Sequence, residues 1–369
     1  MPAADSPANG AFKEWFNADR YRTIADSLDA ATKRFDRETF LELTLDGLTE
    51  RSLMERLHQT TIAADASLTG SFAQKVKILE KITDANDHGF VGVWFAEFVG
   101  RFGRGDPALA LPALRHFTRF GSAEFAIRNF IEDNCDATLS TMLSWTRDPS
   151  EHVRRLASEG SRPRLPWGRR LTAIVDNPAL TRPILEALHT DDSLYVRKSV
   201  ANHLNDITKD HPDYLLDMVE SWDRSHPHTA WIVKQGLRSL IKKGDQRALS
   251  LIGAEAKPNI SVETFTAAPD EITLGDRITL SASLQSIGKK PQRLVIDYAM
   301  NYVKANGQTT AKVFKWKQVD LAPSDRLSLK RTQVIKDFTT RRHYAGVHRL
   351  DLQINGQRFA QTEFTLVIP

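Results

Sequence analysis

One short stretch of the chain places a carboxylate in a strongly basic surrounding. From Arg147 to Arg170 the sequence RDPSEHVRRLASEGSRPRLPWGRR holds seven arginines against three acids, an excess of four positive charges that equals the formal net charge of all 369 residues. Arginines clustered in this way suit a surface that clamps phosphates. Trp167, within the run, could lay its ring on a base or a cation. The unusual residue is Glu159, a carboxylate inside this positive field.

Two further carboxylates fall in comparable surroundings. Glu124 opens a predicted helix, and Asp206 lies on the polar stripe of another. Negative groups that face a nucleic-acid groove are costly unless they do chemistry. Carboxylates can stabilise the positive charge that develops on a sugar when a glycosidic bond breaks, and they can orient the attacking water. The set of Glu124, Glu159 and Asp206 therefore predicts cleavage of an N-glycosidic bond, with Trp167 against a cationic base.

Each of these residues also has a structural explanation. Glu159 could form a surface ion pair with an arginine that follows it. Glu124 could favour the dipole of its helix, with Arg128 as its i+4 partner, and Asp206 could cap the C-terminal end of its helix. Trp167 could anchor a loop by packing on a helix. The residues alone leave both kinds of explanation open.

The elements that must position these residues are helices. From residue 11 to about residue 253 apolar residues recur at spacings of three and four. The segment FVGVWFAEFVGRFG is apolar nearly all round, which predicts a central buried helix. From residue 106 onward the chain repeats a pattern of helix, tight polar turn and helix, as in DPSEHV and DDSLYV, where Asp and Ser precede a second helix. This pattern predicts a HEAT-like helical solenoid.

The second helices of such a solenoid line its concave surface, so we expect a basic groove there. The cations that we expect to bind DNA in this groove are Arg154, Arg155, Arg162, Arg164, Arg169, Arg170, Lys198 and Lys234. Two further lysines, in the turn IGKKP of the C-terminal part, are candidates to contact the opposite groove of the same DNA: Lys289 and Lys290.

Alternating apolar and polar residues replace the helical spacing after LIGAEAKPNISVETF. About seven strands separated by turn signals predict an immunoglobulin-like sandwich without its usual cysteine pair. The predicted fold class is therefore mostly α, with a HEAT-like α-solenoid in residues 1–256 followed by an all-β immunoglobulin-like sandwich in residues 257–369.

Several classes of function lack their signals in this sequence. The single cysteine, Cys135, has no metal-ligand spacing around it, and we find no Gly-rich phosphate loop, no HExxH motif and no serine elbow. We therefore expect no metal and no cofactor. No run of 18 apolar residues and no apolar signal core occurs, so we expect a cytoplasmic protein with no membrane partner.

The segments RRLASEGSRPRLPWG, SLYVRKSVANHLNDITKDHP, HTAWIVKQGLRSLIKKGD and TTRRHYAGVHRLDLQING resemble the AlkC-type DNA alkylation repair glycosylases, HEAT-like repeat enzymes of which one subgroup carries a C-terminal immunoglobulin-like domain. The resemblance implies a monofunctional DNA glycosylase, a hydrolase that removes 3-methyladenine and 3-methylcytosine, with 1-methyladenine as a further candidate, from duplex DNA. It implies that the damaged nucleotide is not fully extruded, and that the enzyme is a bacterial monomer acting at the nucleoid without metal or cofactor.

The resemblance also carries individual residues. Glu159 and Trp167 lie within RRLASEGSRPRLPWG, and Asp206 lies within SVANHLNDI, whereas the segment around Glu124 matches the family pattern less distinctly. Two alternatives follow from the basic groove itself. One is a non-catalytic HEAT-repeat scaffold that binds an acidic peptide, and the other is a catalytically silent binder of branched or distorted DNA.

Overall fold

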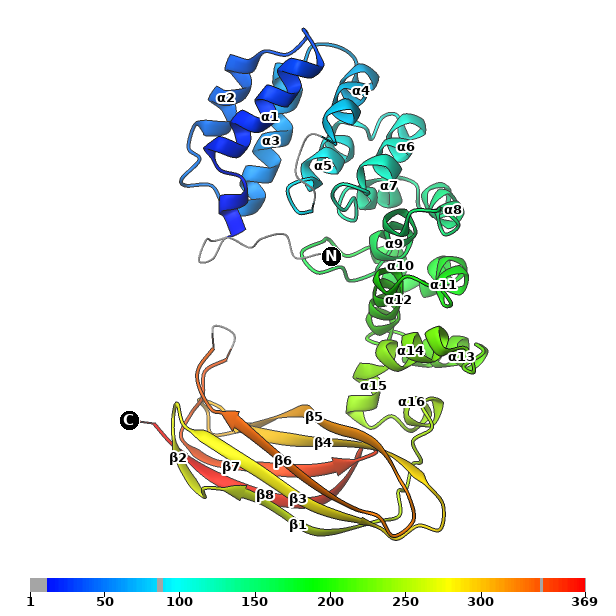
Figure 1. The fold of residues 1–369 in the computed structure, drawn as a ribbon, viewed down its shortest axis with the longest axis vertical. Coiled ribbons are helices and arrows are strands. Elements are labelled where there is room, and N and C mark those ends of the chain that lie inside the picture. The colour runs from blue at the N-terminus through cyan, green and yellow to red at the C-terminus, as the bar shows by residue number, and fades with distance from the viewer. Residues whose placement is uncertain (1–11, 85–88, 339–340, 369) are drawn as a thin grey trace. The chain divides into compact units, whose positions relative to one another are not determined.

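The computed structural model describes residues 12–84, 89–338 and 341–368 (Figure 1). By their contacts the residues form two compact units. One unit comprises Met1–His211 and His226–Ile232, and the other comprises Pro212–Ser225 and Val233–Pro369. The last helix ends at Leu251 and the first strand begins at Ile260. Because the second unit begins before Leu251, it contains the last helices as well as the strands. The predicted boundary at residue 256 stays a prediction.

The first unit consists of helices that follow one another in a row (Figure 1). The segment that is apolar all round is a buried helix, as predicted, with Trp94 and Phe95 in the core. Within the described residues no helix is both long and apolar enough to cross a membrane. The elements of this unit are η1 (Phe12–Trp15), α1 (Ala18–Ala31), α2 (Arg37–Leu45), α3 (Leu53–Ser67), α4 (Phe72–Ile82), α5 (Val93–Phe102), α6 (Pro107–Phe117), α7 (Ile127–Asp133), α8 (Cys135–Trp145), α9 (Glu151–Gly160), α10 (Thr172–Asp176), η2 (Pro178–Thr181), α11 (Arg182–Leu188) and α12 (Leu194–Ile207).

A repeated turn fixes how these helices stack. The Oδ1 atoms of Asp148 and Asp191 each accept a hydrogen bond, at 2.8 Å, from the backbone N–H of the serine two residues later. Each aspartate also binds an arginine from an earlier part of the row. Arg115 donates to Asp148 from Nε at 2.6 Å, and Arg154 donates to Asp191 from Nε at 2.7 Å. These ion pairs connect successive turns and set the starts of α9 and α12.

Helices α9 and α12 lie side by side, with α8 and α11 packed along one side of them, at the right in Figure 1. Buried apolar residues on α9 and α12, among them Val153, Leu156, Val200 and Leu204, face the neighbouring helices. These side chains form the core between the helices. The same two helices also bury polar residues of the candidate site.

The second unit joins a short helical segment to a β-sandwich. Its helices are α13 (Pro212–Glu220), the last four residues of α14 (Pro227–Gly236), α15 (Arg238–Lys243) and α16 (Gln246–Leu251). The sandwich has a three-stranded sheet in the order β1-β3-β6 and a five-stranded sheet in the order β2-β8-β7-β4-β5. The strands are β1 (Ile260–Ala268), β2 (Glu271–Thr273), β3 (Arg277–Ser286), β4 (Gln292–Val303), β5 (Thr309–Leu321), β6 (Arg326–Val334), β7 (Gly346–Ile354) and β8 (Gln357–Val367).

The sandwich confirms the seven predicted strands and adds β2, whose three residues are too short for an alternation to be visible in the sequence. The helices of this unit pack directly on the sandwich. A Cβ atom on Gly356 would lie 2.3 Å from the Cα atom of Gly244, and both residues have φ of +77°. Arg293 and Asn355 of the sandwich donate to the backbone carbonyls that follow α16, at 3.0 and 2.8 Å. The last helices and the strands therefore share one packed interface.

Candidate active site

The last turn of α9 is buried, although it ends in polar residues. Ser158, Glu159 and Gly160 are all buried, and Glu159 is only 5% exposed. Gly160 explains the close packing, because a Cβ atom there would lie 2.5 Å from Cγ2 of Ile127, the first residue of α7. The surface position that sequence reasoning allowed for Glu159 is therefore wrong. The carboxylate lies where a charge needs partners.

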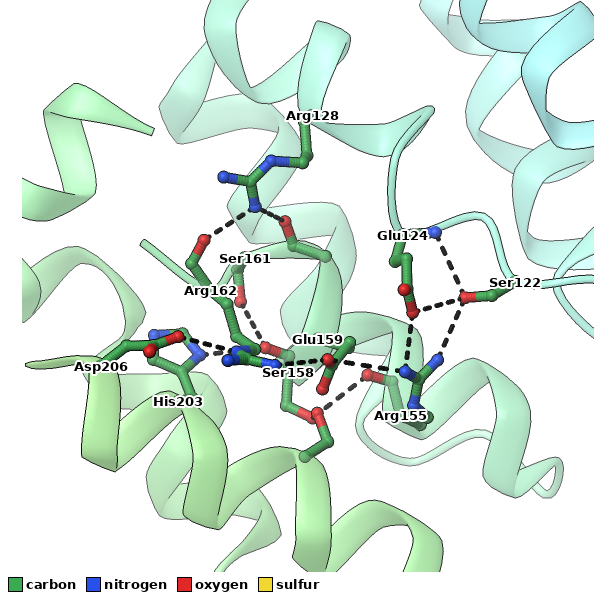
Figure 2. Close-up of polar contacts among 12 residues, drawn as sticks. Ser122, Glu124, Arg128, Arg155, Ser158, Glu159, Ser161, Arg162, His203 and Asp206 are labelled. Carbon is green, nitrogen blue, oxygen red and sulfur yellow. Dashed lines mark hydrogen bonds and ion pairs between the residues drawn. The ribbon is translucent and has the colours of Figure 1, made fainter. Parts of the chain in front are cut away.

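An alternating series of charges supplies those partners (Figure 2). Arg155 binds Glu124 at 2.7 Å and Glu159 at 3.5 Å, and Arg162 binds Glu159 at 2.7 Å and Asp206 at 2.8 Å. The three carboxylates come from the turn before α7, from the last turn of α9 and from the last turn of α12. The structure thus brings all three sequence-predicted carboxylates into one connected cluster, which we call the carboxylate–arginine network.

The arginines of this network remain charged despite their burial. Burial disfavours the charge of Arg155, but the attraction of Glu124 and Glu159 outweighs it and raises the pKa of Arg155. Burial likewise opposes the charge of Arg162, and Glu159 with Asp206 outweighs it and raises the pKa of Arg162. Arg155 also lies over the ring of Tyr195, with its Cζ atom 4.7 Å from the ring centroid. Each buried carboxylate therefore has a permanent positive neighbour.

Both arginines bind the same oxygen of Glu159, Oε1. Asp206 has one oxygen on Arg162 and the other on Lys209, at 2.9 Å. The side chain of Asp206 therefore does not cap its helix, as one interpretation of the sequence had it, but connects α12 to the segment that follows α9. The Oε2 atom of Glu124 accepts from the Ser122 hydroxyl at 2.8 Å.

A buried histidine holds the two helices together beneath this network. His203 on α12 places Nδ1 3.0 Å from the carbonyl oxygen of Ser158 and Nε2 3.2 Å from the hydroxyl of Thr181. A carbonyl can only accept, so Nδ1 carries the proton and Nε2 accepts from the threonine. The Ser158 hydroxyl also lies 2.6 Å from that of Ser199. Burial lowers the pKa of His203 to about 4, so its ring is neutral at neutral pH.

The loop after α9 exposes Trp167. The residue is 80% exposed and has φ of +63°, a backbone region that bulky residues rarely adopt. Leu165, not Trp167, anchors this loop, because Leu165 is buried and its carbonyl accepts from Gly168 N–H at 3.1 Å. The structural explanation of Trp167 as a packing anchor is therefore wrong. A large ring held out in solvent on a strained backbone is available to a ligand.

Arg128 does not pair with Glu124, as its i+4 spacing suggested. Glu124 lies in the turn before α7, not in its first helical turn. Arg128 instead donates to main-chain carbonyls. Its Nη1 atom donates to Gly160 at 3.0 Å and to Arg162 at 2.7 Å (Figure 2), and its Nε atom donates to Arg169 at 3.0 Å. The helical-spacing rule fails here because residue 124 is outside the helix.

The cations predicted to bind DNA differ in how far they are buried and in whether a carboxylate already binds them. Arg155 and Arg162 are in the buried network, whereas Arg154 and Arg164 form bidentate ion pairs with Asp191 and Asp210. Three of the predicted cations on the first unit are exposed, Arg169, Arg170 and Lys198, of which Arg169 pairs with Glu132 at 3.0 Å. The remaining predicted cations belong to the second unit: the half-buried Lys234, and Lys289 and Lys290, which are exposed in the turn between β3 and β4.

Sequence reasoning missed the residues that organise the site. Arg128, Ser158, Ser199 and His203 act through contacts to residues 22 to 45 positions away. Nothing in their local spacing shows these contacts. One signal was available: Ser158, Ser199 and His203 are polar residues next to the apolar stripes of two helices that the repeat pattern makes neighbours.

The fold and the site together define a HEAT-like repeat protein with an appended immunoglobulin-like domain and a set of carboxylates, of which Glu159 and Asp206 are buried. Residues 117–240 match the family model described as DNA alkylation repair enzyme, and residues 261–368 match the C-terminal Ig-like domain of the uncharacterised protein YhaZ. YhaZ of Bacillus subtilis (strain 168) is 38% identical over 346 residues, which cover 94% of this chain and 96% of YhaZ. The chain therefore belongs to the YhaZ and AlkC family of DNA alkylation repair proteins.

A solved structure from the same family is closely similar. The alkylpurine DNA glycosylase AlkC from Pseudomonas fluorescens, bound to DNA containing an abasic site analog, is 45% identical to this chain with a TM-score of 0.93. The match covers 97% of this chain and 100% of that AlkC chain. The family resemblance noted from the sequence is confirmed, and so is the predicted fold class.

Proposed function

We propose that this protein is a DNA glycosylase that removes alkylated bases by hydrolysis of the N-glycosidic bond. The observation that carries the proposal is the carboxylate–arginine network, in which Glu124, Glu159 and Asp206 are brought together at the end of the helix whose following loop exposes Trp167. The similarity to an alkylpurine DNA glycosylase over nearly the whole chain supports the same activity.

The reaction needs a stabilised sugar cation and an oriented water. As the C1′–N bond breaks, its electron pair leaves with the base, and positive charge develops on the deoxyribose. Glu159 faces that charge as a carboxylate. Because both arginines bind Oε1 of Glu159, we assign Oε2 to the attacking water. The water oxygen bonds to C1′, and its proton passes to the carboxylate.

A cationic base reduces what the protein must supply. A base alkylated on a ring nitrogen carries a positive charge and leaves as a neutral molecule, so no group has to protonate it. We therefore propose 3-methyladenine and 3-methylcytosine as substrates in duplex DNA, with 1-methyladenine as a third. Trp167 receives the cationic base or its sugar on the ring face. Glu124 and Asp206 hold the two arginines that orient Glu159 and add negative charge near the sugar.

The exposed cations are the residues that we assign to DNA phosphates on the first unit, namely Arg169, Arg170 and Lys198. Arg154 and Arg164 already have bidentate carboxylate partners. They would contact phosphate only by sharing or exchanging those partners. Within this proposal the protein is a monofunctional enzyme that acts as a monomer and leaves an abasic site.

Replacement of Glu159 tests the proposal. Glu159→Gln keeps the size of the side chain and removes its charge, so release of 3-methyladenine from methylated duplex should fall by roughly 10²- to 10³-fold, the range for loss of one electrostatic stabiliser. The release is measured by chromatography of free bases under single-turnover conditions. The control is Glu151→Gln, which removes an exposed carboxylate from the first turn of the same helix and should leave base release within about twofold of wild type.

The same assay separates the enzyme from the two non-catalytic alternatives. A scaffold for acidic peptides releases no base and does not prefer duplex DNA. A silent DNA binder retains methylated duplex without release. If the wild-type protein produces no free methylated base, the proposed function is wrong, and if Glu159→Gln is as fast as wild type, Glu159 has no part in the reaction.

A further inference from the structure

One fully buried arginine binds both ends of the loop that carries Trp167. Arg128 is 1% exposed. Its Nη1 atom donates to the carbonyls of Gly160 and Arg162, where the loop leaves α9, and its Nε and Nη2 atoms donate to the carbonyl of Arg169, where the loop ends. The guanidinium thus holds the two ends of the loop, residues 162 and 169, together. Figure 2 shows the two bonds at the α9 end.

The electrostatics of Arg128 differ from those of the other buried arginines at the site. Arg155 and Arg162 each bind carboxylates directly, whereas the hydrogen bonds of Arg128 within the described residues all go to main-chain carbonyls. Burial lowers the pKa of Arg128 to about 10, so the group stays charged at neutral pH. Its charge faces the C-terminal end of α9, where the helix dipole is negative.

A buried charge of this kind is not the simplest way to fill the space. An apolar side chain of similar volume often gives equal or greater stability than a buried ion. What the guanidinium provides is geometry, because its planar fork of donors can reach three carbonyls in fixed directions. The three carbonyls belong to the residue after Glu159, to the residue that bridges Glu159 with Asp206, and to the end of the Trp167 loop.

We propose that Arg128 is a positioning residue that fixes Trp167 relative to Glu159. This inference rests on the proposed glycosylase function. Glu159 is held from α9 and the network, while Trp167 sits on an exposed loop with a strained φ. The ring and the carboxylate must engage the base and sugar of one nucleotide. Arg128 provides the rigid connection between them, since the carbonyls of Gly160 and Arg169 bind the same side chain.

Arg128→Lys tests this role while keeping the charge. A lysine has a single nitrogen and cannot reach both ends of the loop. Single-turnover base release should fall by about 10- to 100-fold, as expected for a misplaced contact group, while the affinity for duplex containing an abasic site analogue stays within about threefold. Trypsin should cut after Arg164 sooner than in wild type, because the two ends of the loop are no longer bound to one side chain.

A second substitution distinguishes positioning of Trp167 from a general loss of structure. In a Trp167→Ala background, Arg128→Lys should cost no more than about twofold in rate, because the residue that it positions is gone. An equal loss in both backgrounds would mean that Arg128 does not act through Trp167, and the inference would be wrong. An unchanged rate for Arg128→Lys alone would overturn it as well.

Arg56 offers a matched control within the same chain. It is also buried and also donates to main-chain carbonyls, to Lys13 at 2.8 Å and Phe16 at 2.9 Å. It differs in having an ion pair, with Glu14 at 3.5 Å, and in lying on α3 among the N-terminal helices. Arg56→Lys should lower the unfolding midpoint and leave base release by the folded protein within about twofold of wild type. A rate loss equal to that of Arg128→Lys would show that any lost buried arginine impairs the enzyme, which contradicts the proposal.

Leu165→Ala is an alternative variant for the same loop. If Arg128→Lys does not fold, Leu165→Ala loosens the same loop from its apolar anchor, and it should show the same rate loss and the same dependence on Trp167. A full rate for Leu165→Ala would overturn the inference. The proposed function fails separately, because it requires only that wild type release methylated bases and that Glu159→Gln does not.

Discussion

Helix α9 is built differently at its two ends. The first turn shares its design with α12: an aspartate two residues before a serine closes the preceding turn, and an arginine in the first turn returns to the carbonyls of that turn, Arg154 in α9 and Arg197 in α12. The last turns of the two helices differ. Each buries a carboxylate, Glu159 in α9 and Asp206 in α12, but the last turn of α9 also receives Arg128 at its terminal carbonyl and continues into the loop of Trp167.

The difference separates the parts of the repeat that build the stack from the part that does chemistry. At the first turn the charges join one repeat to the next, as in the pair of Arg154 with Asp191. At the last turn the charges connect three candidate catalytic carboxylates through Arg155 and Arg162. A repeat architecture can keep its stacking contacts at one end of a helix and vary the other, because the two ends have different partners.

Removal of Arg162 should give the largest effect and should affect both stability and chemistry. Arg162→Met leaves Glu159 and Asp206 without their shared cation in a buried site, which typically costs about 3–5 kcal/mol. We also expect base release by the remaining folded protein to fall, since Glu159 loses its nearest partner. Urea unfolding and single-turnover base release measure the two effects.

The first turn supplies the control for that experiment. Asp191→Asn weakens the bidentate pair with Arg154 and should cost about 1.5–3 kcal/mol, the range for a hydrogen bond to a charged group. Base release by folded Asp191→Asn should stay near wild type, because the pair lies at the stacking end of the helix. Equal losses of activity in Arg162→Met and Asp191→Asn would contradict the division of α9 into two ends.

Protonation of His203 should give the next largest effect, and only in acid. The unfolded histidine titrates near pH 6.5, whereas burial lowers the pKa of folded His203 to about 4. Between these values the unfolded chain binds the extra proton and the folded chain does not, so stability falls as the pH drops from about 6.5 to about 4. The difference of roughly 2.5 units corresponds to about 3 kcal/mol.

A His203→Asn variant isolates that contribution. The charged groups near the ring, Asp206, Arg162 and Glu159, are present in both proteins, so the quantity to compare is wild type minus variant. The free energy of urea unfolding at pH 7 and at pH 4 should show an advantage of wild type that shrinks by about 3 kcal/mol in acid. A constant difference across this range would mean that His203 is not buried in its neutral form.

The two ends of α9 were not equally predictable. The stacking end follows from local rules, because Asp, Ser and the apolar spacing mark the turn and the helix start within a few residues. The buried helix α5 and the seven long strands follow from the same kind of pattern. The family motif brought Glu159, Asp206 and Trp167 to attention, and the structure brings Glu124, Glu159 and Asp206 together.

The environment of those residues was not predictable. Whether Glu159 is at the surface or buried depends on Arg155, Arg162 and a neighbouring helix, and the sequence only shows that arginines are nearby. The partners of Arg154 and Arg164 are aspartates 37 and 46 residues further on. Arg128 binds backbone atoms, which carry no sequence signal at all. Local rules therefore located these residues, but their burial and their partners are set by tertiary packing.

The smallest effect should separate stability from activity at a single residue. Trp167→Gly removes the exposed ring and relieves the positive φ of a non-glycine residue, a strain of roughly 1–2 kcal/mol of which part is offset by the greater freedom of glycine in the unfolded chain. The folded protein should therefore be as stable as wild type, or more stable by up to about 1 kcal/mol. Base release should nevertheless fall by roughly 5- to 30-fold, the rate equivalent of a cation–π contact of about 1–2 kcal/mol.

Trp167→Phe is the matched variant, because it keeps an aromatic face and the same backbone strain. It should retain most of the activity and the stability of wild type. The opposite signs of the two effects of Trp167→Gly matter more than their size, since a residue selected for packing loses stability when it is truncated. If Trp167→Gly is destabilised and fully active, the strained loop belongs to the stacking framework, and the last turn of α9 would be no different in kind from the first.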